Sequence, residues 1–317
     1  VLTNQSALYA TASNAPGGDQ GFLTPVNTRE SVIADLNNDG WPDVVTSTTI
    51  SDGDPKYISH PRVYMNQGKD GGGNWLGLKY EETRIPQLLT TTSPHAVAPR
   101  FCGMAVADVN DDGYKDLYFV DYDTTETGIN EPVGDDLNDR LLINNGGSPA
   151  TAGFFSDSLQ TRMTSAQLLS AFGADAQAID INVDGHMDLI KDTTLGGTRK
   201  VAAYYNNPSA VGNFSAMGEQ VLDTSTAPYA MEVGNLNHDA FVDITIVDDG
   251  SDYFRLGSGF GGSPLFYNTW GASKNFSFIA GASSDDGFGH TTHIRDLDMN
   301  GWDDVHITDV DGDVPGC

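Results

Sequence analysis

A nine-residue segment recurs five times along the chain and limits what the chain can fold into. In every copy, Asp or Asn side chains occupy positions 1, 3, 5 and 9, and in four copies a glycine occupies position 6. The clearest copy runs from Asp108 to Asp116, and the others begin at Asp35, Asp180, Asn235 and Asp296. One segment repeated at intervals of 55–73 residues is typical of an array or propeller built from a single structural unit.

Oxygen-bearing side chains at alternate positions, with a glycine that permits a sharp turn, are what a calcium ion requires. Calcium binds about six to eight oxygen atoms, from carboxylates and from main-chain carbonyl groups. Each loop therefore predicts one calcium site, with side chains at positions 1, 3, 5 and 9 and the carbonyl group of position 7 as ligands. The predicted ligand residues are Asp35, Asn37, Asp39, Trp41 and Asp43; Asp108, Asn110, Asp112, Tyr114 and Asp116; Asp180, Asn182, Asp184, His186 and Asp188; Asn235, Asn237, Asp239, Phe241 and Asp243; and Asp296, Asp298, Asn300, Trp302 and Asp304.

The fourth loop departs from this pattern. It carries Asn235 at position 1, so that only two of its ligand positions are charged, and Ala240 replaces the glycine. Alanine is strained in a left-handed backbone conformation. We therefore expect four good calcium sites and a fifth that is weak or empty.

Loops rich in Asp and Asn also occur as metal-free turns and in EF-hands. Asn, Asp and Gly form turns without metal, but turn chemistry alone does not require Asp at position 9. An EF-hand needs a Glu at position 12 and flanking helices. Position 12 here holds Thr46, Phe119, Lys191, Ile246 or Ile307, in segments typical of strands, so the EF-hand is excluded.

The segments around each loop predict four strands per unit, which is one propeller blade. A small apolar strand precedes the loop, and a β-branched or aromatic strand follows it. A third strand ends in an Asn turn, and a fourth strand carries an aromatic residue. The predicted third and fourth strands are 62–66 and 78–82, 140–144 and 154–157, 201–206 and 214–217, and 265–268 and 276–280.

The chain stops after the second strand of its fifth unit, and residues 1–10 resemble a third and a fourth strand. Pairing of these half-blades removes exposed strand edges. We therefore predict an all-β fold with a single domain, a β-propeller of five four-stranded blades closed by its N- and C-terminal half-blades. The predicted blades span about 22–85, 86–162, 163–220, 221–281 and 282–317, the last completed by 1–15. Because the chain begins without methionine or a visible leader, we expect a processed or trimmed product.

The units resemble FG-GAP/VCBS repeats, the calcium-loop blades of integrin α-subunit heads. The resemblance rests on the acidic loops, on the Phe-Gly pairs Phe172-Gly173 and Phe288-Gly289, and on the segment from Arg140 to Gly147. It covers nearly the whole chain and implies calcium ligands at positions 1, 3, 5 and 9. Fungal lectins and some polysaccharide lyases are similar to the same pattern, so the resemblance is specific for fold and calcium but not for function.

The net charge of the chain limits the classes of partner that it can bind. The chain has 16 Lys and Arg residues against 44 Asp and Glu residues, for a net charge of −28, which argues against nucleic acid and anionic membranes. Lacking an apolar stretch of membrane-spanning length, the chain is not expected to insert into a membrane. Bound calcium would offset much of this charge, which favours a calcium-rich extracellular setting. Cys102 and Cys317 allow one disulfide or two separate thiols, and glycosylation sequons begin at Asn4, Asn213 and Asn275.

No catalytic motif stands out. His290 and His293 are three apart on a predicted strand, so they point to opposite faces. Either they pack at a rim, or one of them, with Arg295, lines a sugar site or acts as a base. The aromatic residues at position 7 either pack between blades or form sugar-stacking platforms, and Trp75 and Trp270 are separate lectin candidates. The acidic stretch from Asp121 to Asp139 is a solvated loop, an extra cation site or a docking loop.

These observations favour an extracellular, calcium-stabilised binding or scaffold module that recognises a glycan or a protein surface, as in adhesion. A polysaccharide lyase is the alternative from a different class, although the absence of a recognisable catalytic group argues against an enzyme. A structural subunit of a surface filament is a third hypothesis.

Overall fold

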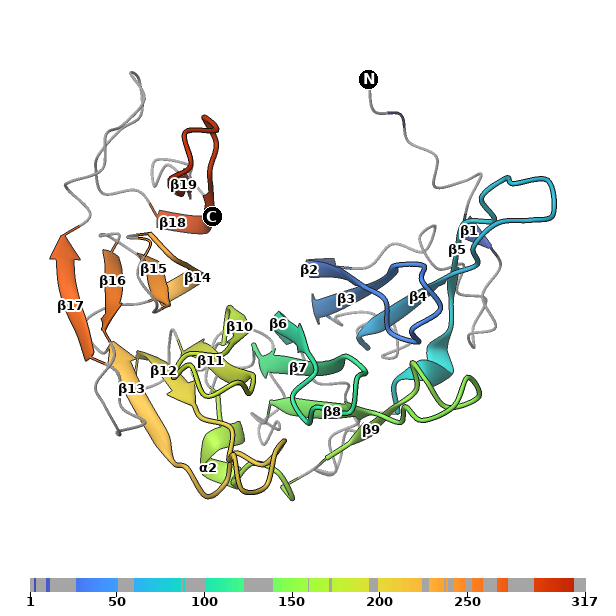
Figure 1. The fold of residues 1–317 in the computed structure, drawn as a ribbon, viewed down its shortest axis with the longest axis horizontal. Helices are drawn as coiled ribbons and strands as arrows, with labels where there is room; N and C mark the ends of the chain where they lie inside the picture. The colour runs from blue at the N-terminus through green and yellow to red at the C-terminus, as the bar shows by residue number, and fades with distance from the viewer. Residues whose placement is uncertain are drawn as a thin grey trace. The chain divides into compact units, whose positions relative to one another are not determined.

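In its described residues, the computed structural model has five sheets that follow one another along the chain and are antiparallel except for one strand pair in the first sheet (Figure 1). It describes residues 3, 10–11, 27–50, 60–86, 88, 101–122, 139–158, 160–170, 173–193, 199–223, 228–236, 238, 242–248, 253–258, 267–272 and 288–310. The chain divides into two compact units, Val1–Ser170 and Ala171–Cys317. The all-β prediction is confirmed; the blade count and the closure of a ring stay predictions.

The first unit holds two sheets. The first has the strand order β1-β5-β4-β3-β2 and the second β6-β7-β8-β9. Their strands are β1 (Ala10–Thr11), β2 (Asn27–Ala34), β3 (Asp43–Ile50), β4 (Arg62–Asn66), β5 (Leu78–Tyr80), β6 (Phe101–Ala107), β7 (Asp116–Asp121), β8 (Arg140–Asn144) and β9 (Phe155–Asp157). A 3-10 turn, η4 (Glu82–Arg84), follows β5, and a short helix, α2 (Ser165–Leu168), follows β9. Within the described N-terminal residues, β1 pairs parallel with β5 and so extends the first sheet.

The second unit holds three sheets, in the orders β10-β11-β12-β13, β14-β15-β16-β17 and β18-β19. Their strands are β10 (Ala176–Ile179), β11 (Asp188–Thr193), β12 (Lys200–Tyr204), β13 (Glu219–Asp223), β14 (Pro228–Gly234), β15 (Asp243–Asp248), β16 (Tyr253–Ser258), β17 (Tyr267–Ala272), β18 (Phe288–Arg295) and β19 (Asp304–Val310). Each acidic loop joins the first two strands of its sheet, as predicted.

The strand assignments were wrong in two repeats. In the third repeat the fourth strand is β13, Glu219–Asp223, because residues 214–217 form a turn in which Phe214 is buried. In the fourth repeat, residues 267–272 form the fourth strand, and the third is Tyr253–Ser258. The Asn turn that marks other third strands is missing from this one, so the recurrent Asn was misleading here.

Among the described residues, apolar side chains from neighbouring sheets form a core in each unit. In the first unit, Val45 and Met65 of one sheet pack with Leu117 and Phe119 of the next. In the second unit, Ile190 and Ala203 pack with residues of β14 and β15. Burial of such faces, at about 25 cal/mol per Å² of apolar surface, is the main force that joins one sheet to the next.

Candidate metal centres and a neighbouring groove

The residue at position 1 holds each described loop in shape. Asp35 accepts hydrogen bonds from Asp39 N–H to Oδ1 (3.2 Å) and from Gly40 N–H to Oδ2 (2.8 Å). Asp108, Asp180 and Asp296 accept the equivalent bonds, and the glycine N–H lies 2.7–2.8 Å from Oδ2. Position 1 therefore caps the turn, as Asp does in many turns, while it presents its carboxylate to the loop interior.

The backbone of the loops is left-handed at two positions. Position 4 has φ of 56–59° in all five loops, and the glycine at position 6 has φ of 86–94° in four of them. For a β-branched residue such as Val183 at position 4, this conformation is a genuine outlier. In the fourth loop His238 has the same φ of 56°, so that loop keeps at least this part of the turn.

The carboxylate at position 9 is buried and has a structural role that the spacing alone does not reveal. Asp116 is 1% exposed; its Oδ2 accepts from Val109 N–H at 3.0 Å and its Oδ1 from Asn144 N–H at 2.8 Å. Asp43 and Asp188 make the same pair of bonds. Burial, the largest effect, raises the pKa of Asp43 to about 6 and that of Asp116 to about 7, while the main-chain donors partly oppose this.

The Asn that ends the third strand ties these loops together. Asn144 Nδ2 donates to Leu36 O of the neighbouring sheet at 2.8 Å and to Lys115 O at 3.0 Å. Asn66 and Asn206 donate to the carbonyl groups of Pro42 and Met187, which precede position 9. The recurrence of this Asn was visible in the sequence, but its connection to position 9 was not.

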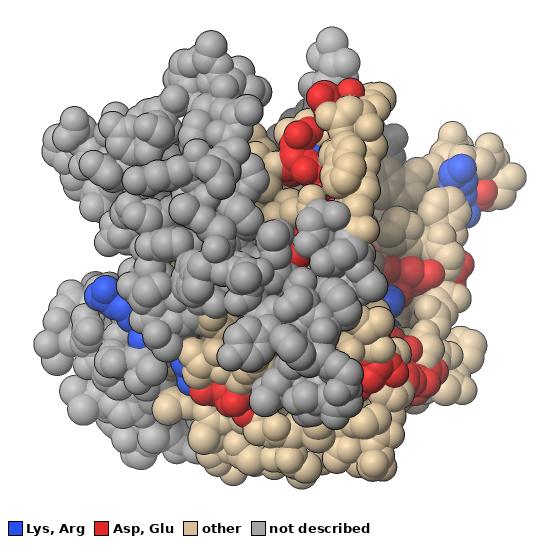
Figure 2. All heavy atoms as spheres, turned by 60° about the vertical axis from the view of Figure 1, so that its left-hand side comes forward, with Lys and Arg blue, Asp and Glu red and all other residues tan. Residues whose placement is uncertain are grey.

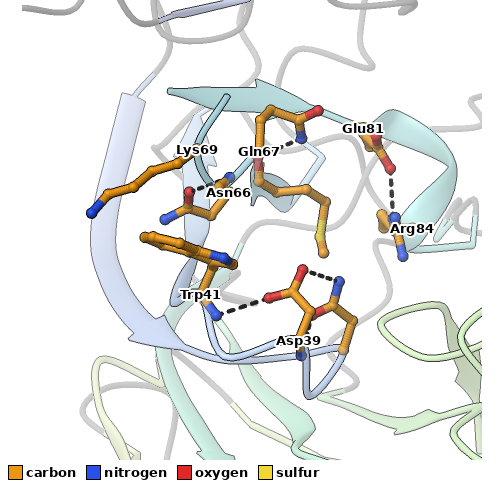
Figure 3. Close-up of a pocket in the computed structure, with 10 residues that line it drawn as sticks. Asp39, Trp41, Asn66, Gln67, Lys69, Glu81 and Arg84 are labelled. Carbon is orange, nitrogen blue, oxygen red and sulfur yellow. Dashed lines mark hydrogen bonds and ion pairs between the residues drawn. The ribbon is translucent and has the colours of Figure 1, made fainter. Parts of the chain in front are cut away.

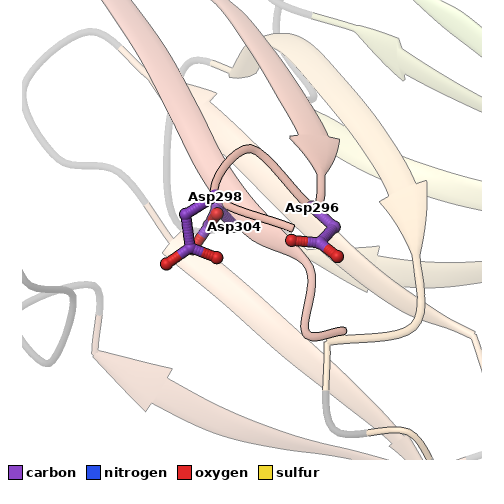
Figure 4. A group of neighbouring side chains, drawn as sticks. All are labelled: Asp296, Asp298 and Asp304. Atoms are coloured by element: carbon purple, nitrogen blue, oxygen red, sulfur yellow. The ribbon is translucent and has the colours of Figure 1, made fainter. Parts of the chain in front are cut away.

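The loops fit a calcium ion by donor type and charge. In loop 5 the ligand oxygens of Asp296, Asp298 and Asp304 lie within 4.8 Å of one another (Figure 4). In the described part of the chain, no Lys or Arg pairs with the carboxylates at positions 1 and 5 of the first three loops. Clustered hard oxygen donors without a protein counter-charge suit a divalent cation of this class. On the face drawn in Figure 2, the described surface likewise carries several acidic groups and few basic ones.

Among the described residues, the structure brings the predicted carboxylate ligands together in loop 5, and the ligand sets of loops 1, 2 and 3 stay predictions. In the fourth loop, Asn237, Asp239 and Phe241 lie outside the described residues. Its position 9 is preserved, because Asp243 Oδ2 accepts from Leu236 N–H at 2.6 Å. The reduced charge of that loop still predicts the weakest site.

The aromatic residues at position 7 pack in two ways. Tyr114 lies over Gly146, where an added Cβ would come within 2.3 Å of the ring, and Trp41 lies in the same way over Gly68; both contacts stay within one sheet. Trp302, on loop 5, stacks on His238 of loop 4 with ring centroids 4.2 Å apart. Of the separate tryptophan candidates, Trp75 donates to Asn66 Oδ1, whereas the side chain of Trp270 lies outside the described residues.

A shallow groove of about 510 Å³ lies beside loop 1. Asn37, Asp39 and Trp41 of the loop line it together with Gln67, Lys69 and Arg84 (Figure 3). The Lys69 ammonium lies 5.5 Å from the centre of the Trp41 ring. On the opposite side, Arg84 donates to Glu81 Oε2 at 2.7 Å and to Ala152 O at 3.0 Å. The groove therefore presents an indole, amide groups and fixed charges of both signs.

The remaining candidates are structural or lie outside the described residues. Asp139, at the end of the acidic stretch, is buried and accepts from Tyr118 Oη and Asp121 N–H; residues 123–138 are not described. Cys102 is buried, and Cys317 is not described, so their pairing stays open. The sequon residue Asn213 accepts from Ser215 N–H and Oγ, whereas Asn4, Asn275 and the His290 side chain are not described.

Residues 35–119, which contain the first two acidic loops, match the model of the FG-GAP-like repeat. This segment is an FG-GAP-like repeat. FG-GAP repeats often bind calcium and are found in binding and adhesion domains of extracellular proteins. The resemblance that the acidic loops carry is thus confirmed over this segment. No curated protein matches the chain. In the part of the chain that is described, no helix is long and apolar enough to cross a membrane.

Proposed function

We propose that this chain is an extracellular β-propeller module whose acidic loops bind calcium and whose first unit recognises a glycan. The calcium sites are those of loops 1, 2, 3 and 5, with a weaker site in loop 4. Support comes from the repeated loop geometry, from the carboxylates that lack a basic partner and from the FG-GAP-like match. Propeller closure, secretion and adhesion belong to the same proposal.

The observation that carries the binding role is that loop 1 and the groove share residues. Asn37, Asp39 and Trp41 belong to both, so calcium in the loop would set the shape of one groove wall. A mostly polar groove with an indole suits a sugar, whose hydroxyl groups need hydrogen-bond partners and whose ring stacks on aromatic side chains. Lys69 and Arg84 favour sugars that carry carboxylates.

A glycan array probed with and without calcium tests the proposal. Binding of uronate-containing glycans should require calcium and should weaken in the variants Gln67→Ala and Lys69→Ala. Lys115→Ala is the matched control, because Lys115 is exposed and does not line the groove. Binding that survives both groove variants would place the ligand elsewhere.

Further assays of the same protein preparation distinguish the enzyme and filament hypotheses from the binding-module hypothesis. Release of unsaturated uronate from a polysaccharide would support the lyase hypothesis, and polymerisation without glycan binding would support the filament. The described residues do hold a His-Arg-Tyr cluster, formed by His60, Arg62 and Tyr80, which are 4%, 0% and 2% exposed. Both ring nitrogens of His60 contact carbonyl groups, those of Pro61 and Pro86, so this buried cluster does not favour an enzyme.

A further inference from the structure

Two histidines face each other across the last sheet. His293 on β18 is paired directly with His306 on β19, and these strands lie side by side in Figure 1. Their rings are parallel within 3° with centroids 6.5 Å apart, and both side chains are exposed. Residues opposite each other in antiparallel strands hold their Cβ atoms about 4.5–5.5 Å apart, which is close enough for two imidazoles to share one ion.

A carboxylate from the preceding sheet lies beside the pair. Glu232 Oε2, on β14, is 3.8 Å from His293 Nδ1, and the Glu232 side chain is only 17% exposed. The other carboxylate oxygen, Oε1, accepts from Arg295 Nη1 at 3.1 Å. Arg295 thus orients the carboxylate and leaves one oxygen facing the histidine.

The repeat architecture does not call for histidines here. Two residues after position 9, where His306 stands, the earlier sheets carry Val45, Tyr118, Ile190 and Thr245, each at most 1% exposed. His293, three residues before position 1, likewise corresponds to Val32, Ala105, Gln177 and Glu232. Only the last repeat places imidazoles at both positions, and it places them opposite each other.

Imidazole nitrogen distinguishes this cluster from the acidic loops. Calcium prefers oxygen ligands, whereas imidazole suits zinc, copper and nickel. Two histidines and one glutamate are a known set of protein ligands for zinc, with water in the fourth position. The positive charge of Arg295 opposes the binding of a metal cation. Removal of Arg295 would also free the second oxygen of Glu232, Oε1, to bind the ion.

We propose that His293, His306 and Glu232 bind one divalent transition-metal ion of the zinc class, separately from the calcium loops. Because the ring centroids are 6.5 Å apart, binding requires a rotation of the two exposed imidazoles that brings their nitrogens and Glu232 Oε2 onto the ion. The site draws on β18 and β19, the last two strands described along the chain, and on β14, and so links the last described sheet to the one before it.

Calorimetric titration of the full chain with zinc chloride at pH 7.5, in excess calcium, tests this site. We expect one zinc ion per chain. His293→Ala and His306→Ala should each weaken zinc binding by more than the roughly tenfold that loss of an outer-shell partner costs, and Glu232→Gln should also weaken it. Arg295→Ala should tighten binding, which a purely packing role for these residues does not predict.

The control is Thr308→Ala, an exposed residue of β19 that leaves both histidines in place and should leave zinc binding unchanged. If the histidine variants fold poorly, the imidazole NMR signals of the unaltered protein replace them, and zinc should shift only the signals of His293 and His306. Zinc binding that is undiminished in both histidine variants, zinc-induced shifts at other histidines, or no zinc uptake would overturn the proposal.

Discussion

At the residue scale, the aspartate at position 9 has both a predicted metal-binding role and a structural role. The carboxylate at position 9 is a predicted metal ligand, and in loops 1, 2 and 3 its oxygens are also buried against the N–H groups of position 2 and of the Asn at the end of the third strand. Position 1 caps the turn and stays at least partly open to solvent. The two positions therefore differ in what their loss would cost, although they look alike in the sequence.

Asp116→Asn should destabilise the protein with or without calcium, because an amide cannot accept hydrogen bonds from both Val109 and Asn144. Loss of a buried partner of this kind costs about 1–3 kcal/mol. Asp108→Asn should be destabilising mainly when calcium is present. Chemical unfolding of both variants in calcium and in EDTA measures the difference; equal behaviour of the two would contradict the dual role of position 9.

The buried aspartates Asp175 and Asp192 make the free energy of unfolding depend on pH. Asp192 Oδ1 accepts from Ala174 N–H and Asp175 N–H, and its Oδ2 is buried without a hydrogen-bond partner. Burial first, and the charge of Asp175 second, raise the pKa of Asp192 well above its usual value, and burial raises the pKa of Asp175 to about 7. The folded state therefore binds more protons than the unfolded state between about pH 4 and 7.

Stability from this pair is fully present below the unfolded pKa, near 4, and is lost as pH rises through the folded values. Asp192→Asn removes one of the two charges, so it should raise the free energy of unfolding at pH 8 by on the order of 2 kcal/mol and change little at pH 4. Urea unfolding at the two pH values, with calcium held constant, tests this. An equal gain at both pH values would point to packing instead of charge.

At the scale of elements, neighbouring sheets pack so closely that one contact leaves no room for an added methyl group. Gly234, at the end of β14, lies against Ile294 of β18, where an added Cβ would sit 2.8 Å from Ile294 Cγ2. Backbone amides join the sheets as well: Met104 N–H donates to Glu30, and Met231 N–H donates to Asp175. Carboxylates five residues before the loops thus hold the first strand of the next sheet in both units.

Gly234→Ala should destabilise the second unit by about 1–3 kcal/mol, the usual cost of overpacking. Adding Ile294→Ala should recover part of this loss, because the methyl group then has space. A double-mutant cycle measured by thermal unfolding gives the coupling energy. Additive effects of the two substitutions would mean that β14 and β18 do not meet in solution as they do here.

At the scale of the whole molecule, the net charge is −28, and 14 of the 44 acidic residues occupy ligand positions of the five loops. Removal of calcium would leave three uncompensated carboxylates in each of four loops, and in loop 5 the ligand oxygens of these carboxylates lie within 4.8 Å of one another. Like charges at such short range repel, and the repulsion is relieved by unfolding.

Thermal unfolding in calcium and in EDTA, with the bound metal counted by mass spectrometry, tests the calcium prediction. We expect about four calcium ions per chain, from the four loops with three carboxylates, and a much lower melting temperature in EDTA. A protein without bound metal, with the same melting temperature in both buffers, would mean that the acidic loops are only turns.

The sequence by itself determined the local structure: loops with oxygens at fixed spacing, their left-handed glycines and the strands on either side. These features follow from neighbours along the chain, so spacing alone predicts them. Only the tertiary structure decided which residues meet across sheets. The partners of Asp116, the groove beside Trp41, the stack of His238 on Trp302 and the pairing of His293 with His306 depend on register and packing between segments far apart in sequence, where alternation of side chains leaves several arrangements equally compatible with the pattern.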